Sequence, residues 1–134
     1  LVGLDENRLT FGLSAEPESI SRTPVHLGDV VEIPTASIAI ADTLSRRLRS
    51  SGGAALIIDY GYWGPALGDT LQALHAHQFS DPLDRPGDAD LTTHVDFHWL
   101  ARAAAAQGVR WHGPLRQADF LAALGIETRA HSLK

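Results

Sequence analysis

One segment constrains the fold more than any other part of the chain: GGAALIIDYG, at residues 52–61. Five consecutive apolar residues, 54–58, stand between a glycine pair and an end made of an acid, an aromatic residue and a glycine. A continuous apolar run bounded by glycines is typical of a strand covered on both faces, as in a parallel α/β sheet. Because ligands in such sheets bind beyond the carboxyl ends of the strands, the pattern places candidate chemistry at Asp59, Tyr60 and Gly61.

The surrounding sequence alternates between helical and strand-like patterns. Thr35 as N-cap and Gly52 as stop predict a helix directly before the apolar run, with Ile38, Ala41 and Leu44 on one face. The other expected elements are a hairpin over 1–13, a loop over 14–29, a short extended piece over 30–34, a loop over 62–68, a strand over 70–77, an irregular segment over 80–90, helices over 96–107 and 115–124, and a short strand over 109–112. This order favours an α/β fold with a mixed sheet and flanking helices.

Length and composition limit the classes of protein to which the chain can belong. Its 134 residues suit one domain, and its net charge of −5 argues against a nucleic-acid partner, which requires a basic face. No apolar stretch approaches the roughly 20 residues of a membrane span. With zero cysteines there is no disulfide framework, which fits a reducing compartment. The chain opens without methionine and stops just after a turn, so we expect a single partial domain over 1–134, with hairpin and loop in 1–29 and sheet and helices in 30–134.

Four strings in the second half of the chain carry a family resemblance. They are IIDYG at 57–61, GDTLQAL at 68–74, DLTTHVDF at 90–97 and GPLRQADFLAALGI at 113–126. In this order they resemble the MidA family of S-adenosylmethionine-dependent methyltransferases, from about Val30 onward. The resemblance implies the C-terminal portion of a Rossmann-like class I methyltransferase fold. It also implies S-adenosylmethionine as cofactor, with the glycine-rich binding loop before Leu1, so no cofactor-binding residue is assigned in this chain.

The resemblance further implies methyl transfer to a protein arginine side chain, with this chain supplying the substrate-side half of the site. The family includes a mitochondrial assembly factor that methylates a complex I subunit, so a respiratory complex subunit is among the implied protein partners. The expected location is the cytoplasm of a bacterium, or the mitochondrial matrix in a eukaryote. A divided sheet would expose a strand edge and an apolar helix face, which predicts a homodimer or pairing with the missing N-terminal half.

The end of the apolar run holds the first group of candidate site residues. A guanidinium acceptor needs carboxylates that fix its planar fork, and a carboxylate at the end of a buried strand is costly unless it is paired. Asp59 is therefore a candidate catalytic residue, with Tyr60 and Gly61 as candidate substrate-binding residues. In the structural alternative, Asp59 caps loop amides around Gly61 and Gly64, and Tyr60 packs beneath the substrate-binding position.

The densest polar group of the chain is the second candidate. In a substrate-facing loop, Asp90 or Asp96 would grip the acceptor, His94 would relay a proton, and Thr92 would bind substrate. In the alternative, this segment begins a helix, with Thr92 or Thr93 as N-cap and Asp96 in the first turn. For Asp96 we favour the capping role; His94 stays open.

The acidic stretch 81–96 supports a different class of function. A non-catalytic interaction domain could use it to dock a basic partner. Asp81, Asp84 and Asp88 stand beside proline and glycine, however, and turn formation is the favoured reading for these three.

Two pairs of histidines raise a metal-hydrolase alternative. His75 and His77 would share one face of a strand, and His94 and His98 one face of a helix. The sequence has neither an H-E-x-x-H motif nor a cysteine, so no metal site is assigned.

Overall fold

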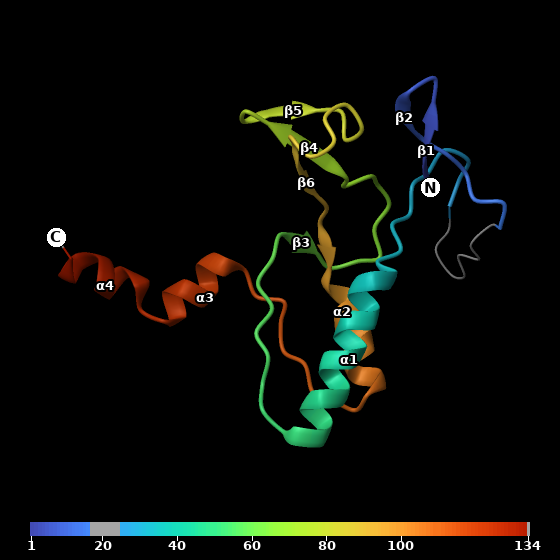
Figure 1. Cartoon of the computed structure of the whole chain (residues 1–134). Helices are drawn as coiled ribbons and strands as arrows, with labels where there is room; N and C mark the ends of the chain where they lie inside the picture. Colours follow the sequence, from blue (N-terminus) through green and yellow to red (C-terminus); the bar gives the residue numbers. More distant parts are fainter. Residues whose placement is uncertain (17–24, 134) are drawn as a thin grey trace.

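The computed structural model describes residues 1–16 and 25–133 as helices, short strands and long connections (Figure 1). The elements are β1 (Val2–Asp5), β2 (Arg8–Phe11), α1 (Thr35–Ser51), β3 (Gly61–Tyr62), β4 (Gln72–His75), β5 (Gln78–Ser80), β6 (Asp90–Thr92), β7 (Val95–Asp96), α2 (Phe97–Ala106), α3 (Gln117–Ala123) and α4 (Ile126–Ser132). The mixed α/β class is confirmed. Part of the loop expected over 14–29 falls on 17–24, outside the described residues; its remaining residues form no helix or strand.

The packing of α1 on α2 forms the central contact of the structure (Figure 1). Ala41 and Ser45 of α1 and Ala101 of α2 are buried, and such small side chains let the two helices approach closely. Arg49 Nη1 also donates to the carbonyl oxygen of Gln107 over 2.9 Å, which ties the two C-terminal ends together. Both helices and the inward position of Ala41 agree with the sequence pattern. The expected N-cap is wrong by one residue: Thr35 is the first residue of α1 and Pro34 precedes it as the cap, with no side-chain cap bond.

A parallel strand pair leads directly into α2. Gly61 pairs with Val95 and Tyr62 with Asp96, and the amide of Val95 donates to the carbonyl oxygen of Tyr60 over 2.9 Å. Residues 60–62, which follow the apolar run, are thereby fixed beside the N-terminus of α2.

A three-stranded antiparallel sheet, in the order β5-β4-β6, lies above this pair in Figure 1. Ala73 of β4 pairs with Leu91 of β6 and is 1% exposed. Ala76 and His77 have φ values of 50° and 63°, the positive values that a two-residue hairpin turn requires. The strand expected over 70–77 is confirmed as the shorter β4, which ends before the turn at Ala76 and His77, and the irregular segment expected over 80–90 is confirmed for residues 81–89.

The N-terminal hairpin expected over 1–13 is also confirmed. Val2 pairs with Phe11 and Asp5 with Arg8, and Glu6 and Asn7 form the turn with positive φ.

The expectation of a buried strand over 54–58 is wrong for this structure. Residues 53–59 form no ladder, and Leu56 and Ile58 are 68% and 65% exposed. The strand expected over 109–112 is absent as well. The physical reason is the same for both segments: a strand is defined by hydrogen bonds to a neighbour, and no described strand lies beside either. The Rossmann-like sheet predicted from the sequence is therefore not formed by the described residues.

The C-terminal part forms two short helices where the sequence predicted one longer helix. The helix predicted over 115–124 is shorter, as α3, and α4 follows as a helix that the sequence reading missed. Gly125, with φ 81°, ends the first helix as predicted and lets the chain begin the second. No residue of α3 or α4 is buried, and both project away from the helix pair in Figure 1. None of the helices in the described ranges has the length and apolarity needed to cross a bilayer.

Candidate functional site

Asp96 is the charged residue about which the candidate site is built. It lies at the end of β7, serves as the N-cap of α2, and is 4% exposed. Its Oδ1 accepts hydrogen bonds from the amide of His98 over 2.9 Å and from the amide of Gly64 over 3.1 Å. The favoured capping role of Asp96 is confirmed, with one correction: Asp96 itself is the cap, in place of Thr92 or Thr93, because the strand continues to residue 96.

Two glycines allow the backbone to approach this carboxylate. A β-carbon on Gly64 would overlap with Oδ2 of Asp96 and lie 2.8 Å from its Cγ. A β-carbon on Gly61 would overlap with the carbonyl oxygen of Val95 and lie 2.7 Å from Cε2 of Phe97. At Gly61 the overlap is with backbone, so this position excludes every other residue, whereas at Gly64 a β-carbon would displace the Asp96 carboxylate. For Gly61 this is a structural role in the strand pair, next to the substrate-binding role predicted from the sequence.

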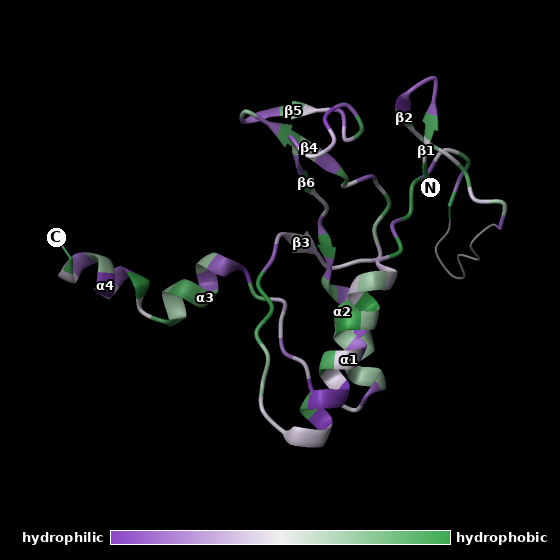
Figure 2. Ribbon diagram, in the orientation of Figure 1, coloured by the Kyte–Doolittle hydropathy of each residue, from purple (hydrophilic) through white to green (hydrophobic). Residues whose placement is uncertain are grey.

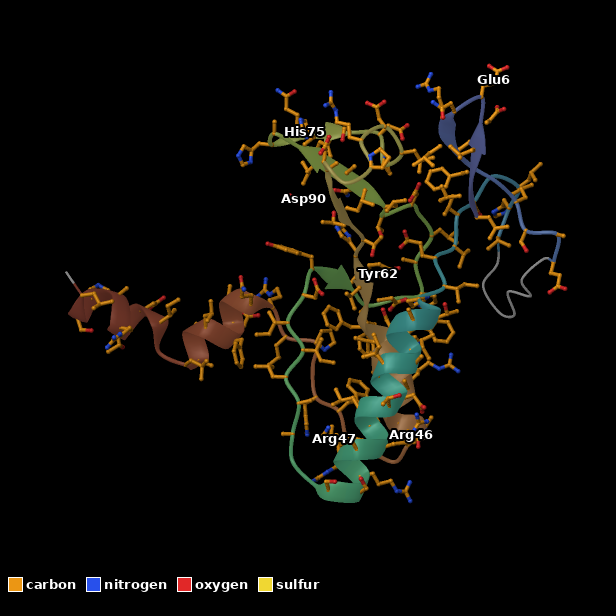
Figure 3. The ribbon with its side chains drawn as sticks, in the orientation of Figure 1. Glu6, Arg46, Arg47, Tyr62, His75 and Asp90 are labelled. Carbon is orange, nitrogen blue, oxygen red and sulfur yellow. The ribbon has the colours of Figure 1, made fainter. Side chains whose placement is uncertain are left out.

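Tyr62 is close enough to two carboxylates for their charges to affect its phenol. Burial raises the pKa of its phenol above the ordinary value of 10.0, and the negative charges of Asp96 and Glu32 raise it further. Figure 3 shows Tyr62 near the meeting point of β3 and the N-terminal end of α1. The phenol therefore stays protonated at neutral pH and can donate a hydrogen bond.

Glu32 is held by Thr70 from a distant part of the chain. Thr70 donates from its amide to Oε1 over 2.8 Å, and its hydroxyl lies 2.9 Å from Oε1 and 2.7 Å from Oε2. The same hydroxyl oxygen accepts from the amide of His94 over 3.0 Å. One threonine thus joins the segment before α1 to the segment between β6 and β7. Glu32 is half-buried, and no basic side chain of the described residues pairs with it.

The first group of predicted site residues is at the surface. Asp59 is exposed, and its Oδ1 accepts from the amide of Tyr60 over 2.8 Å, a bond within the turn. The Tyr60 side chain is 84% exposed. The capping of Gly64 that sequence reasoning gave to Asp59 is performed by Asp96. The end of the apolar run is therefore open to solvent.

The second group is divided along one extended segment. Asp90 and Thr92 belong to β6 and pair with Leu74 and Gln72, so they lie in a strand and not in a loop or a helix start. Figure 3 shows Asp90 toward the three-stranded sheet, with Tyr62 nearer the helices. His94 is exposed between β6 and β7. The structure thus joins His94 and Asp96 to the Tyr62 site and places Asp90 farther along the strand.

Sequence reasoning missed Glu32, Tyr62 and Thr70. The signal for Glu32 was a lone acid within the apolar piece VVEIP, where a carboxylate is unusual unless it has partners. For Thr70 there was no local signal, because its partners are 38 and 24 residues away.

Aromatic rings border the site on the α2 side. The ring centroids of Trp63 and Trp111 are 5.2 Å apart, and the Trp63 ring meets the ring of His98 edge-on at 5.4 Å. Both tryptophans are 44% exposed, so they form a rim and not a core.

The histidine pairs do not converge. His75 Nδ1 lies 2.8 Å from the carbonyl oxygen of Asp88, and His98 contacts Trp63. Among residues 1–16 and 25–133, no three side chains of the metal-binding types gather.

Of the acidic turn residues, Asp81 accepts from the amide of Leu83 over 2.8 Å, as expected for a residue that forms a turn.

The described residues do not form a cradle for a nucleoside cofactor. An open hollow of about 460 Å³ lies on α1, lined by Ala39, Ile40, Thr43, Leu44 and Arg47. It lacks the carboxylate that would bind ribose hydroxyls, and the sequence has no glycine-rich turn that could approach a cofactor closely.

Fold and site together define a mixed α/β chain with carboxylates arranged around a phenol and an aromatic rim. A profile for the family described as "Putative S-adenosyl-L-methionine-dependent methyltransferase" matches residues 4–115. The chain belongs to this family.

Curated relatives agree with the family match. The chain is 47% identical over 96 residues to "Protein arginine methyltransferase NDUFAF7, mitochondrial" of Rattus norvegicus, covering 72% of this chain and 21% of the relative. It is 39% identical over 139 residues to the Danio rerio protein of the same name, covering 99% and 32%. For the Homo sapiens protein, identity is 38% over 125 residues, covering 93% and 28%. The chain thus spans between about a fifth and a third of the length of these relatives.

Proposed function

We propose that a polypeptide carrying this chain transfers methyl groups from S-adenosylmethionine to arginine side chains of a protein, and that this chain supplies the acceptor side of the site. The observation that carries the proposal is the family match over residues 4–115. The relatives named as protein arginine methyltransferases support the choice of arginine as acceptor.

Glu32 is the residue that the structure adds to this proposal. It is a half-buried carboxylate whose described hydrogen bonds all come from Thr70. The negative charges of Asp96 and Glu32 both act on the phenol of Tyr62, and neither carboxylate forms an ion pair among the described residues. A planar guanidinium would supply a pairing cation and the donors that carboxylates accept.

The other predicted residues take roles around this carboxylate. We propose that Asp59 and Asp90, both exposed, attract and orient the basic acceptor segment. His94, fixed through its amide by Thr70, would accept the proton that leaves the guanidinium nitrogen. Tyr60, with its ring exposed, would cover the apolar stem of the arginine, while Thr92 and the backbone at Gly61 line its approach.

S-adenosylmethionine supplies the activated methyl group, and its recognition lies with residues other than those described. This chain acts by holding the acceptor nitrogen in a fixed orientation, which lowers the entropic cost of the reaction. The proposed location is the mitochondrial matrix in a eukaryote, as the relatives' names suggest, and the cytoplasm in a bacterium. The proposed partner is a protein substrate, with a subunit of a respiratory complex as the candidate that the family resemblance implies.

The test uses a chimera in which this chain replaces the matching segment of the Danio rerio relative. Calorimetry should detect binding of S-adenosylmethionine to the chimera. Mass spectrometry should then find methylated arginine in a panel of peptides with one arginine each, and no methylation of the matched lysine peptides. Absence of cofactor binding, or methylation of lysine instead, would contradict the proposal.

Variants separate catalysis from simple docking. Glu32→Gln should lower kcat/KM by about 10- to 100-fold, the value of one charged hydrogen-bonding group. Asp119→Asn is the matched control, since Asp119 of α3 is exposed and pairs with Arg116, the residue before this helix. If Asp90→Asn abolished binding of basic peptides while no variant affected methylation, the acidic stretch would be a docking surface and not part of the acceptor site.

A further inference from the structure

Thr70 holds the carboxylate of Glu32 along one edge. Its amide donates to Oε1 over 2.8 Å. Its hydroxyl oxygen lies 2.9 Å from Oε1 and 2.7 Å from Oε2, nearly the same distance from both. Because donors prefer to lie near the plane of the oxygens they bind, this hydroxyl stands across the edge that joins the two carboxylate oxygens. A carboxylate binds the planar fork of a guanidinium along that edge. In Glu32 the edge is therefore already occupied.

The orientation of this hydroxyl is fixed from a second side. Its oxygen accepts from the amide of His94 over 3.0 Å, and His94 lies in the segment between β6 and β7. A threonine hydroxyl has a single hydrogen to donate. With the amide bound to the oxygen, that hydrogen points to the carboxylate. Thr70 therefore cannot turn away from Glu32 without leaving the amide of His94 unpaired.

The remaining acceptor positions of Glu32 decide how a ligand can bind it. An ionised carboxylate has about four lone-pair sites, an inner and an outer one on each oxygen. The amide of Thr70 takes one site of Oε1, and the hydroxyl, in a three-centre bond, faces the inner site of each oxygen. Among the described residues, the outer site of Oε2 is the one that stays open. Glu32 is a hydrophilic residue between the hydrophobic Val31 and Ile33 in the segment that leads into α1 (Figure 2).

We infer that Thr70 is a positioning residue that restricts Glu32 to one hydrogen bond with the acceptor side chain, made end-on by a single nitrogen at the outer site of Oε2. The inference rests on the proposed function, in which Glu32 binds the acceptor arginine. A fork along the edge would bind two nitrogens of the guanidinium at once. An end-on bond holds one terminal nitrogen and leaves the other terminal nitrogen free of Glu32, so that it can point at the methyl donor.

A single contact recognises positive charge but not the shape of the group that carries it. The lysine ammonium is a point charge, whereas the arginine guanidinium gains a second parallel bond when it meets an open carboxylate edge. With the edge closed by Thr70, Glu32 should contribute equally to the binding of arginine and lysine side chains. The preference for arginine in methyl transfer then comes from the placement of the second nitrogen and not from the strength of binding to Glu32.

Double-mutant cycles measure the contribution of Glu32 to each ligand. Calorimetry gives the affinity of the chimera for a peptide with one arginine and for the matched lysine peptide. Glu32→Gln should weaken both by the same factor, within about twofold. In the Thr70→Val background the edge no longer faces a hydroxyl and can turn toward the ligand. Glu32→Gln should then weaken binding of the arginine peptide about 10-fold more than binding of the lysine peptide, the value of one further charged hydrogen bond.

The controls separate this effect from damage to the fold. Thr70→Ser retains the hydroxyl and should leave the two factors equal, whereas Thr70→Ala lacks it and should behave as the valine variant does. General damage would weaken both peptides together and would not create a difference between them. A 10-fold larger effect of Glu32→Gln on the arginine peptide in the unmodified chimera would overturn the inference, because the edge would then be open. Equal factors in both backgrounds that lack the hydroxyl, or no effect of Glu32→Gln on either peptide, would overturn it as well.

Kinetics distinguish this inference from the proposed function. Thr70→Val should lower kcat for the arginine peptide by about 10- to 100-fold without raising KM, because a misplaced acceptor nitrogen reacts slowly. The rate is counted per site that binds S-adenosylmethionine, so an unfolded fraction does not enter it, and Thr70→Ser should recover it. Methylation of arginine with a kcat that Thr70→Val leaves unchanged would reject the inference alone. A chimera that binds no S-adenosylmethionine would reject the proposed function, while the peptide affinities would still decide how Glu32 binds its ligand.

Discussion

The amide of Gly64 donates to the carboxylate of Asp96 across 32 residues of sequence, at a distance of 3.1 Å. The same oxygen, Oδ1, caps α2 through the amide of His98. One buried acid therefore fixes both the loop after β3 and the first turn of a helix. Because its backbone partner leaves no room for a β-carbon, the site depends on a glycine at position 64.

Gly64→Ala should destabilise this junction by about 2–4 kcal/mol, since the new methyl group would displace a buried carboxylate from its donors. Urea unfolding of the chimera measures the change. Gly3→Ala is the matched control, because a β-carbon there meets nothing within 4 Å, and its effect should stay within about 0.5 kcal/mol. Equal effects of the two substitutions would show that Asp96 does not approach Gly64 as described.

The two carboxylates beside Tyr62 make the protonation of its phenol a reporter of the site. Burial, Asp96 and Glu32 all raise the pKa, so the folded state holds the proton more tightly than the unfolded state. The resulting stability is fully present below pH 10.0, the ordinary pKa, and is lost as the pH rises through the higher folded value.

The measurement is tyrosine ¹³Cζ NMR of the chimera, using the signal that Tyr62→Phe removes. Its midpoint should lie above 10.0 and should move down in Glu32→Gln, which removes one of the two charges. A midpoint unchanged by Glu32→Gln would mean that Glu32 does not affect the pKa of Tyr62.

Sequence patterns predicted the elements that local interactions stabilise. The N-terminal hairpin, α1 and α2 each have a turn, cap or periodic face within a few residues, and each formed close to its expected bounds. The capping of α2 by Asp96 belongs to the same class, because the cap bonds an amide two residues away.

Elements that depend on distant partners could not be predicted in this way. The apolar pattern of 54–58 correctly indicates a segment that prefers burial, but burial also needs neighbours on both faces, and the described residues supply none. The contacts of Glu32 likewise depend on a threonine 38 residues away, for which no spacing rule exists. The predicted catalytic roles of Asp59, Asp90, His94 and Asp96, and the substrate-binding roles of Tyr60, Gly61 and Thr92, stay predictions.

Thr70 should act as a bridge whose hydroxyl is essential and whose methyl group is not. Thr70→Val removes the hydroxyl bonds to Glu32 and to the amide of His94 and keeps the bond from its own amide to Glu32, while Thr70→Ser retains all of them. We expect Thr70→Val to cost about 1–3 kcal/mol and to speed exchange of the His94 amide, because the half-buried Glu32 loses its hydroxyl donor and the His94 amide loses its acceptor. Exchange mass spectrometry on the chimera measures this rate. A serine variant as perturbed as the valine variant would assign the effect to packing.

The small residues between α1 and α2 set the distance between these helices. Ala41→Leu should cost about 1–3 kcal/mol, since three extra carbon atoms must fit a contact where Ala41 is 6% exposed. Ala106→Leu, near the exposed C-terminal end of α2, should be close to neutral. Arg49 joins the same two helices by donating to the carbonyl oxygen of Gln107. The loss of stability in Ala41→Leu should therefore appear as faster exchange of the Gly108 and Val109 amides, which bond to the last turn of α2. Unchanged exchange in Ala41→Leu would mean that α1 and α2 do not pack through this residue.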